Sequence, residues 1–181
     1  MEHTVRAYDE ELDAITAELS RMGGLAEAEV TDAIRAISRR DVAIAQAVIG
    51  RDAKLDELEA DIERKAIRLI AIRQPVADDL RRTVAAMKIS MNLERCGDLA
   101  KNIAKRALVI AESEPLSPLT RSIERMGELV AGRLKDVLDA FAARDLDRAV
   151  QVRERDKEVD EHYDAIFREL LTYMMGDPRT I

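Results

Sequence analysis

The sequence is poor in cysteine, aromatic residues and long apolar segments. Its one cysteine, Cys96, excludes an internal disulfide and is typical of a reducing compartment. Aromatic residues make up only 3% of the chain and tryptophan is absent, so the core must consist of aliphatic side chains and methionine. No apolar run is long enough to cross a membrane, and residues 1–13 lack the apolar segment of a secretory signal. These absences predict a cytoplasmic protein.

A clustered basic surface is also missing. The chain has 36 acidic and 29 basic residues, a formal net charge of −7, and its lysines and arginines are scattered among acids. A nucleic-acid partner would need basic residues on one face, so the composition argues against one. The 36% of charged residues is typical of long, solvated helices.

Helical periodicity fills almost all of the chain between its four prolines. Apolar residues recur every three or four positions, and the prolines lie where these patterns stop. Asp41 is well placed to cap a helix N-terminus. The expected helices span approximately residues 5–37, 41–74, 78–112, 119–143 and 145–175. The pattern predicts an all-α fold.

The chain repeats itself at a shift of 104 positions. The matching segments are 21–23 with 125–127, 40–41 with 144–145, 51–52 with 155–156, and 56–57 with 160–161. The first and second expected helices therefore correspond to the fourth and fifth. We expect a first three-helix unit at residues 1–112, a linker at 113–118, and a second unit at 119–181.

The third expected helix has no counterpart in the second unit. Its copy would begin 104 positions after Asp78, beyond the 181 residues of the sequence. Two amphipathic helices without a third leave an apolar stripe uncovered, which a soluble protein tolerates poorly. We expect the helices at 119–143 and 145–175 to bury this stripe against another chain or the first unit, or to be mobile. Burial against another copy of the chain would make the protein a homodimer.

Two acids continue an apolar seam on the third expected helix. The members of that seam are Leu80, Val84, Met87 and Met91. The same rhythm of four and three residues leads on to Glu94 and Asp98, one turn apart. Two carboxylates turned toward a bundle interior repel each other and need a neutralising cation.

The second expected helix carries a matching acidic stripe. Asp52 and Asp56 begin it, and Glu59 is a weaker candidate one turn further on. If the two helices pack antiparallel, both acid sets face each other, and such oxygen-rich clusters suit Mg, Mn, Fe or Zn. In the second unit Asp156 and Asp160 repeat the first two acids. The alternative is that all these acids form an ordinary solvated face.

The sequence has no pattern typical of catalysis. His162 follows Glu158 by four residues rather than three, so the Glu-x-x-His pattern of di-iron carboxylate bundles is absent. There is no Ser/His/Asp or Cys/His arrangement and no glycine-rich phosphate loop. Cys96 lies on a second apolar seam of its helix and is expected to be a core residue.

One segment resembles a signature of the PhoU family of phosphate-signalling regulators. That signature is Leu-Glu-Arg-x-Gly-Asp-x-x-x-Asn-Ile, and the matching segment is Asn92-Leu93-Glu94-Arg95-Cys96-Gly97-Asp98-Leu99-Ala100-Lys101-Asn102-Ile103. Residues 3–12, Met22-Gly23 and the spacing of Asp52 and Asp56 are also similar to that family. The resemblance implies tandem three-helix bundles, of which the second is incomplete here, with two helices.

The resemblance also implies a metal site. Motifs of the form Glu/Asp-x-x-x-Asp bind multinuclear iron or zinc clusters in some members of the family. The matching residues are Asp52, Asp56, Glu94 and Asp98, with Asn102 on the next turn, and Asp156 and Asp160 in the second unit. Magnesium or manganese is the alternative, and metal content varies within the family, so an empty site is also compatible with it.

The function implied by the resemblance is regulatory rather than enzymatic. Members of the family are thought to link the phosphate-specific ABC transporter to a sensor histidine kinase, damping the phosphate-starvation response when phosphate is ample. We therefore expect a negative regulator that modulates phosphate uptake, contacts the transporter ATPase and the kinase, and meets the membrane only through them. Two alternatives remain: a metal–carboxylate enzyme, or a metal-binding bundle with a purely structural role.

Overall fold

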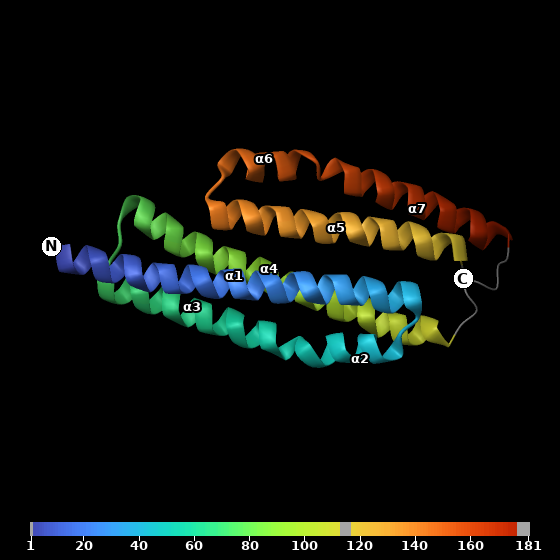
Figure 1. Ribbon diagram of the computed structural model, residues 1–181, viewed down its shortest axis with the longest axis horizontal. Coiled ribbons are helices and arrows are strands. Elements are labelled where there is room, and N and C mark those ends of the chain that lie inside the picture. The colour runs from blue at the N-terminus through green and yellow to red at the C-terminus, as the bar shows by residue number, and fades with distance from the viewer. Residues whose placement is uncertain (1, 113–116, 177–181) are drawn as a thin grey trace.

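A computed structural model describes residues 2–112 and 117–176, which form seven helices and no strand (Figure 1). The helices are α1 (Glu2–Arg39), α2 (Val42–Arg51), α3 (Ala53–Arg73), α4 (Ala77–Ala111), α5 (Ser117–Ala143), α6 (Leu146–Glu154) and α7 (Lys157–Gly176). The predicted all-α fold is confirmed. Most of the expected linker, 113–116, lies outside the described residues, and α5 already begins at Ser117.

Two of the expected helices are broken, which corrects the sequence prediction. Segment 41–74 forms α2 and α3, which meet at Asp52, and segment 145–175 forms α6 and α7, which meet at Arg155 and Asp156. Asp52 keeps right-handed helical backbone angles (φ −51°, ψ −40°), so the conformation there departs little from that of a helix. The two breaks lie 104 residues apart, in register with the internal repeat.

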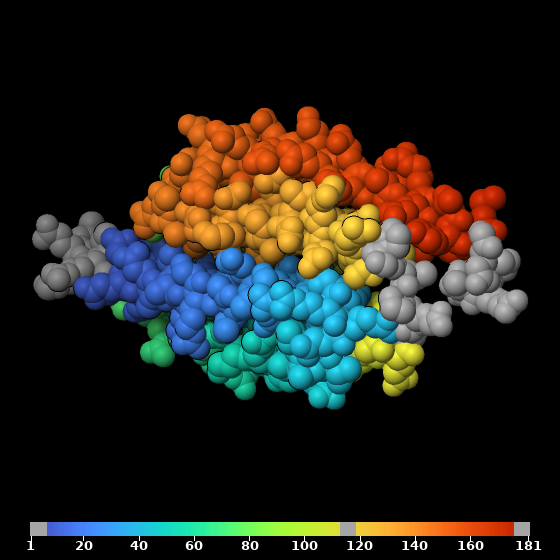
Figure 2. Space-filling model, turned by 45° about the vertical axis from the view of Figure 1, so that its right-hand side comes forward, coloured from blue at the N-terminus to red at the C-terminus, as the bar shows by residue number. Residues whose placement is uncertain are grey.

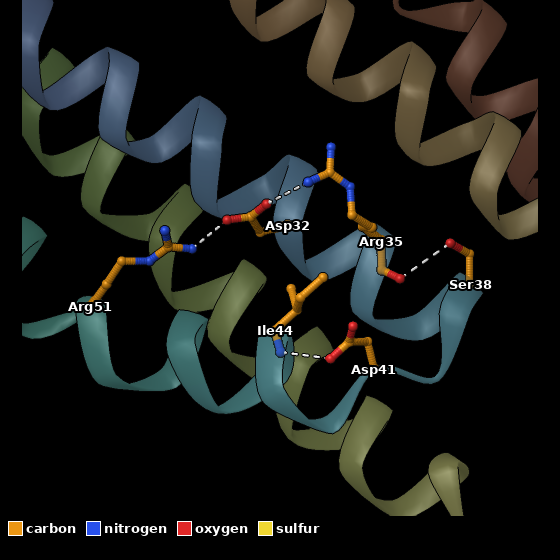
Figure 3. Close-up of polar contacts among 6 residues, drawn as sticks. All are labelled: Asp32, Arg35, Ser38, Asp41, Ile44 and Arg51. Carbon is orange, nitrogen blue, oxygen red and sulfur yellow. Dashed lines mark hydrogen bonds and ion pairs between the residues drawn. The ribbon is translucent and has the colours of Figure 1, made fainter.

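The turn that precedes α2 is repeated before α6. Arg40 and Arg144 adopt left-handed backbone angles, with φ of 54° and 55°. The next residue then caps the new helix by accepting a hydrogen bond from the backbone amide three positions on. That bond measures 3.0 Å for Asp41 (Figure 3) and 2.9 Å for Asp145. The predicted cap at Asp41 is confirmed, because its carboxylate satisfies an amide that lacks a helical partner.

The core lies between α1 and the three helices that follow it. One cluster of buried side chains joins α1, α3 and α4, and a second joins α1, α2 and α4. The largest fully buried side chains of these clusters include Ile15, Leu19, Met22, Leu55 and Ile62. Each such side chain contributes about 1.5–3 kcal/mol when it leaves water, so the first unit contains most of the hydrophobic stabilisation.

The buried face of α4 differs from the expected one. Leu80, Val84 and Met91, predicted to form a core seam, are 38%, 37% and 59% exposed. The positions that are buried are mostly small: Thr83, Ala86, Ser90, Leu93, Gly97, Ala100, Ala104 and Ala107. Small side chains let α1, α2 and α3 approach α4 closely, so close packing rather than side-chain size selects the face.

The two units pack through their first helices. α1 and α5 lie side by side and run antiparallel, with α6 and α7 on the outer side of α5 (Figures 1 and 2). The space at Gly23 of α1 is filled by Leu138, and the space at Gly127 of α5 is filled by Ile34. Each pair maps onto the other by the shift of 104, so the interface has the reciprocal form of a two-fold contact.

The second unit leaves part of its apolar face open. Leu55 and Ile62 of α3 are 1% and 0% exposed, whereas their repeat equivalents Val159 and Ile166 of α7 are only half-buried. In the described part of the chain, α6 and α7 pack chiefly on α5, and no helix covers them as α4 covers α2 and α3. The predicted burial against the first unit therefore holds for α5 alone.

An apolar groove of about 640 Å³ is lined by residues of α1, α4, α5 and α6. Across residues 2–112 and 117–176, no helix has the length and apolarity needed to span a membrane.

Candidate functional site

An acidic cluster forms where the start of α3 faces the middle of α4. Its predicted members are Asp52, Asp56, Glu59, Glu94 and Asp98. Asp52 is only 3% exposed, and its carboxylate accepts a hydrogen bond from the Lys101 ammonium. The same ammonium lies 3.4 Å from Oδ1 of Asp98, so one lysine joins site residues from two parts of the sequence.

Glu94 shows that the remaining acids of the cluster are close together. Burial raises the pKa of its carboxyl group, and Asp98, Asp56 and Glu59 raise that pKa further because each adds negative charge nearby. The two predicted acid sets therefore meet, as the antiparallel packing of their helices required.

Gly97 sets the approach of the helices at this point. A Cβ atom here would collide with Leu55 and would lie 3.3 Å from Oε2 of Glu29. Because glycine has no side chain, α4 can lie close to α1 and to the start of α3. The glycine sits between Glu94 and Asp98 in sequence, so the close approach also fixes the position of both carboxylates.

One acid of the cluster, Glu29 on α1, was not among the residues predicted from the sequence. Its side chain is 2% exposed, and Oε2 has no hydrogen-bond partner among the described residues. Burial raises the pKa of Glu29 from 4.5 to about 7, and the charge of Asp52 adds to that rise. The positive charges of Arg51 and Lys101 lower the pKa of Glu29, but by less than burial and Asp52 raise it.

A signal for Glu29 was present in the sequence. It follows Met22 and Ala26 at steps of four and three, and Ala33 comes four residues later, all buried on one face of α1. A lone acid within an apolar helical seam is expected to have a special environment. Arg51, whose charge acts on Glu29, forms its ion pair with Asp32 instead, at 2.5 Å (Figure 3).

The other predicted site residues lie apart from the cluster. Asn102, on the next turn of α4, is exposed. Asp156 and Asp160 are exposed on the second unit, and no described helix stands opposite them as α4 stands opposite α3. The first unit alone therefore brings two sets of acids together in the described residues.

The donor set of the acidic cluster fits a divalent cation. A buried carboxylate oxygen without a partner and carboxylates that repel one another would both be stabilised by positive charge. Among the described residues, however, no three acidic, histidine or cysteine side chains are arranged to hold a metal ion. The metal site stays a prediction.

Cys96 has the environment of a core residue, as predicted. It is half-buried and packs against both core clusters. Burial raises the pKa of its thiol, which keeps the sulfur protonated at neutral pH and makes it a poor nucleophile.

A family model described as the PhoU domain matches residues 19–107 and 123–180, one match in each unit. The chain is 68% identical, over 99% of its own length and 78% of the relative's, to a phosphate-specific transport system accessory protein PhoU homolog from Caulobacter vibrioides strain NA1000 / CB15N. A homolog with the same description from Rhizobium meliloti strain 1021 is 49% identical, over 99% of this chain and 76% of its own.

Two solved structures have the same fold. The crystal structure of PhoU from Pseudomonas aeruginosa superposes with a TM-score of 0.92 at 38% identity, over 95% of this chain and 82% of its own. The crystal structure of the phosphate transport system regulatory protein PhoU from Streptococcus pneumoniae gives a TM-score of 0.86 at 27% identity, over 94% and 80%. These similarities extend across both units.

Proposed function

Because this chain belongs to the PhoU family, we propose that it is a regulatory accessory protein of the phosphate-specific transport system. The observation that carries the proposal is the high identity, over nearly the whole chain, to relatives that bear this description. In finer terms, the protein is a cytoplasmic adaptor that contacts the transporter ATPase and a sensor histidine kinase. It represses the phosphate-starvation response when phosphate is ample, and it acts through its surfaces rather than by catalysis.

The proposal is tested with a phosphate-responsive promoter in a host that lacks its own regulator of this family. Expression of this chain should restore repression at high phosphate. The variant Glu94→Ala/Asp98→Ala should restore less, because it removes two carboxylates of the acidic cluster while leaving the buried face of α4 intact.

A matched control is Glu57→Ala/Asp61→Ala, which removes two acids with the same spacing from the solvent side of α3, where they pair with Lys54 and Lys65. This control should repress like the unchanged chain. Full repression by the Glu94/Asp98 variant would exclude the acidic cluster from regulation, and no repression by the unchanged chain would contradict the proposed function itself.

A second candidate function is cation binding at the acidic cluster, and the mutual repulsion of its carboxylates favours it. Asp52, Asp56, Glu94 and Asp98 would hold the ion, with iron or zinc implied by the family resemblance and magnesium or manganese by the oxygen donors. The cation would supply the positive charge that ties α3 to α4 at this point.

Metal analysis of the purified chain and calorimetric titration with Mn²⁺ test this second function. We expect binding that the Glu94→Ala/Asp98→Ala variant loses. Equal binding by both proteins would place any cation elsewhere. The enzymatic alternative would require turnover by the iron-loaded protein, and no feature of the described residues favours it.

A further inference from the structure

Glu29 is the exception among the buried polar residues that the structure describes. The other three with exposure below 4% all make hydrogen bonds: Asp52 with Lys101, Thr83 with Tyr8 and the Asp79 carbonyl, and Ser90 with the Met87 carbonyl. Glu29 has Oε2 without a partner in the described part of the chain. An unsatisfied buried carboxylate is costly, so its retention in a well-packed helix needs an explanation.

The position of Glu29 relates it to the acidic cluster. Its Oε2 lies against Gly97 of α4, between the sequence positions of Glu94 and Asp98. The charges that act on it come from Arg51, Asp52 and Asp56, around the junction of α2 and α3, and from Lys101 on α4. The carboxylate therefore points from the core into the inner side of the cluster.

Lys101 lies at the same inner side. Its ammonium bonds Asp52 and contacts Asp98, and its side chain is 27% exposed, so it reaches the cluster from the solvent side of α4. One ammonium at this place offsets part of the negative charge but leaves Oε2 of Glu29 without a hydrogen-bond partner among the described residues. A flexible lysine stem can extend toward solvent once a cation takes over the charge that its ammonium offsets.

We propose that Glu29 is the interior ligand of a divalent cation shared with Asp52, and that the Lys101 ammonium holds the cation's place when none is bound. This inference rests on the proposed cation site at the acidic cluster and assigns it a ligand from α1. The ion would join α1 to α3 and α4, because its oxygen ligands come from all three. Withdrawal of Lys101 is the step that frees Asp52 for the ion, because the Lys101 ammonium bonds the Asp52 carboxylate in this structure.

The experiment is calorimetric titration of the full chain with MnCl₂ after removal of bound metal by EDTA. Loss of even an outer partner of a bound metal costs about 10- to 100-fold in affinity, so Glu29→Gln should weaken Mn²⁺ binding at least about tenfold. Lys101→Met should tighten binding about fivefold or more, because a competing unit charge beside the ion is removed. Thermal unfolding with and without Mn²⁺ gives a second readout, in which the upward shift of Tm should shrink for Glu29→Gln and grow for Lys101→Met.

Two matched controls lie outside the cluster. Glu57→Gln and Lys54→Met remove the same charges from an exposed pair on α3 and should leave Mn²⁺ affinity within about twofold. Glu29→Gln keeps the shape of the side chain and removes a buried charge, so the variant should fold at least as well as the parent chain.

The outcomes distinguish the role of Glu29 from the existence of the cation site. If Glu29→Gln binds Mn²⁺ as tightly as the parent chain while Glu94→Ala/Asp98→Ala does not bind, the cation site stands and the role of Glu29 is overturned. If the parent chain binds no Mn²⁺, both the cation site and the role of Glu29 in it are wrong. The regulatory function is tested separately by the promoter assay. Weaker binding by Lys101→Met would overturn the role given to the lysine.

Discussion

At the scale of single residues, Glu29 gives the protein a pH-dependent stability. Its pKa rises from 4.5 to about 7 on folding, so between these values the native state holds a proton that the unfolded chain has lost. The free energy of unfolding therefore falls as pH rises from 4.5 to 7, by about 3 kcal/mol in total, and this contribution is constant above pH 7.

Glu29→Gln should remove that slope and make the metal-free protein more stable above pH 7. Urea unfolding at a series of pH values in EDTA measures the effect. Glu57→Gln is the control, since Glu57 is fully exposed and the pKa of its carboxyl is lowered by Lys54, so the slope between pH 4.5 and 7 should persist. An unchanged slope in Glu29→Gln would assign the pH dependence to another group.

The spacing of acids in the sequence predicted five members of the cluster, but it did not predict Glu29 or Lys101. Asp52, Asp56 and Glu94 follow from helical periodicity, because one face of a helix is set by steps of three and four. Glu29 lies on a third helix, and its approach to the cluster depends on how α1 crosses α4 at Gly97. Lys101 looks like an ordinary surface lysine until its distance to Asp52 is known. Contacts between helices are not encoded in the periodicity of any one of them.

At the scale of elements, the two repeated turns differ in one function. Arg40 donates from Nη2 to the carbonyls of Ile110 and Ala111, at 2.7 and 2.9 Å, and so caps the C-terminus of α4. Its repeat equivalent Arg144 is highly exposed and lies 3.9 Å from Asp13. Both residues have the left-handed backbone angles that favour glycine.

Substitution by glycine should therefore have opposite effects at the two turns. Arg144→Gly should stabilise the protein by about 0.5–1 kcal/mol through relief of backbone strain. Arg40→Gly gains the same relief but loses charge-assisted hydrogen bonds worth about 1.5–3 kcal/mol, so a net loss of about 1 kcal/mol is expected. Urea denaturation of the two variants measures both values, and equal changes would contradict the capping role of Arg40.

Helix starts and the Pro75 break were predictable at this scale, whereas the interruptions at Asp52 and Arg155 were not. Asp41 is recognisable because its short carboxylate caps an amide three residues on. Asp52 makes no side-chain capping hydrogen bond and has nearly helical backbone angles. The break there therefore involves no capping motif that could be recognised in the sequence. On α4, hydrophobicity favoured Leu80 and Val84 for the core, but the close approach of its neighbours buried Ala86 and Gly97 instead.

At the scale of the whole molecule, the contact between the two units depends on a pair of glycines. Gly127→Ala should destabilise the protein by about 1–2 kcal/mol, because the added methyl group forces Ile34 out of its place. Gly23→Ala should have a similar effect through Leu138. Gly132→Ala is the control on the same helix, since open space surrounds it, and it should stabilise by up to about 1 kcal/mol. Chemical denaturation compares the three, and equal effects would show that the glycines do not set the contact.

The open face of α7 predicts self-association. Tyr163 and Phe167 stack with ring centroids 6.5 Å apart, and with Leu171 they form an apolar stripe in which each side chain is 42–59% exposed. The expected homodimer would cover such a stripe. Phe167→Glu, which restores the acid found at the equivalent position of the first unit, should shift a dimer toward monomer in sedimentation velocity. Arg168→Glu, beside the stripe, should leave the distribution unchanged, and a monomeric parent chain would contradict the homodimer.

The duplication was predictable from the sequence, because identities at a fixed shift do not require a structure. The way in which the copies meet was not. It depends on how Leu138 and Ile34 fill the space at Gly23 and Gly127, and the helical periodicity of the sequence does not encode those contacts.

The distribution of the core between the units also has a consequence for biosynthesis. All the buried side chains of the two core clusters belong to α1–α4. To these clusters α5 adds only partly buried side chains, such as Leu134 and Phe141. Synthesis proceeds from the N-terminus, and domains generally fold as units in that order. We therefore expect the first unit to condense as soon as α4 has left the ribosome. The second unit would then be synthesised later and would fold against the surface of an already folded first unit.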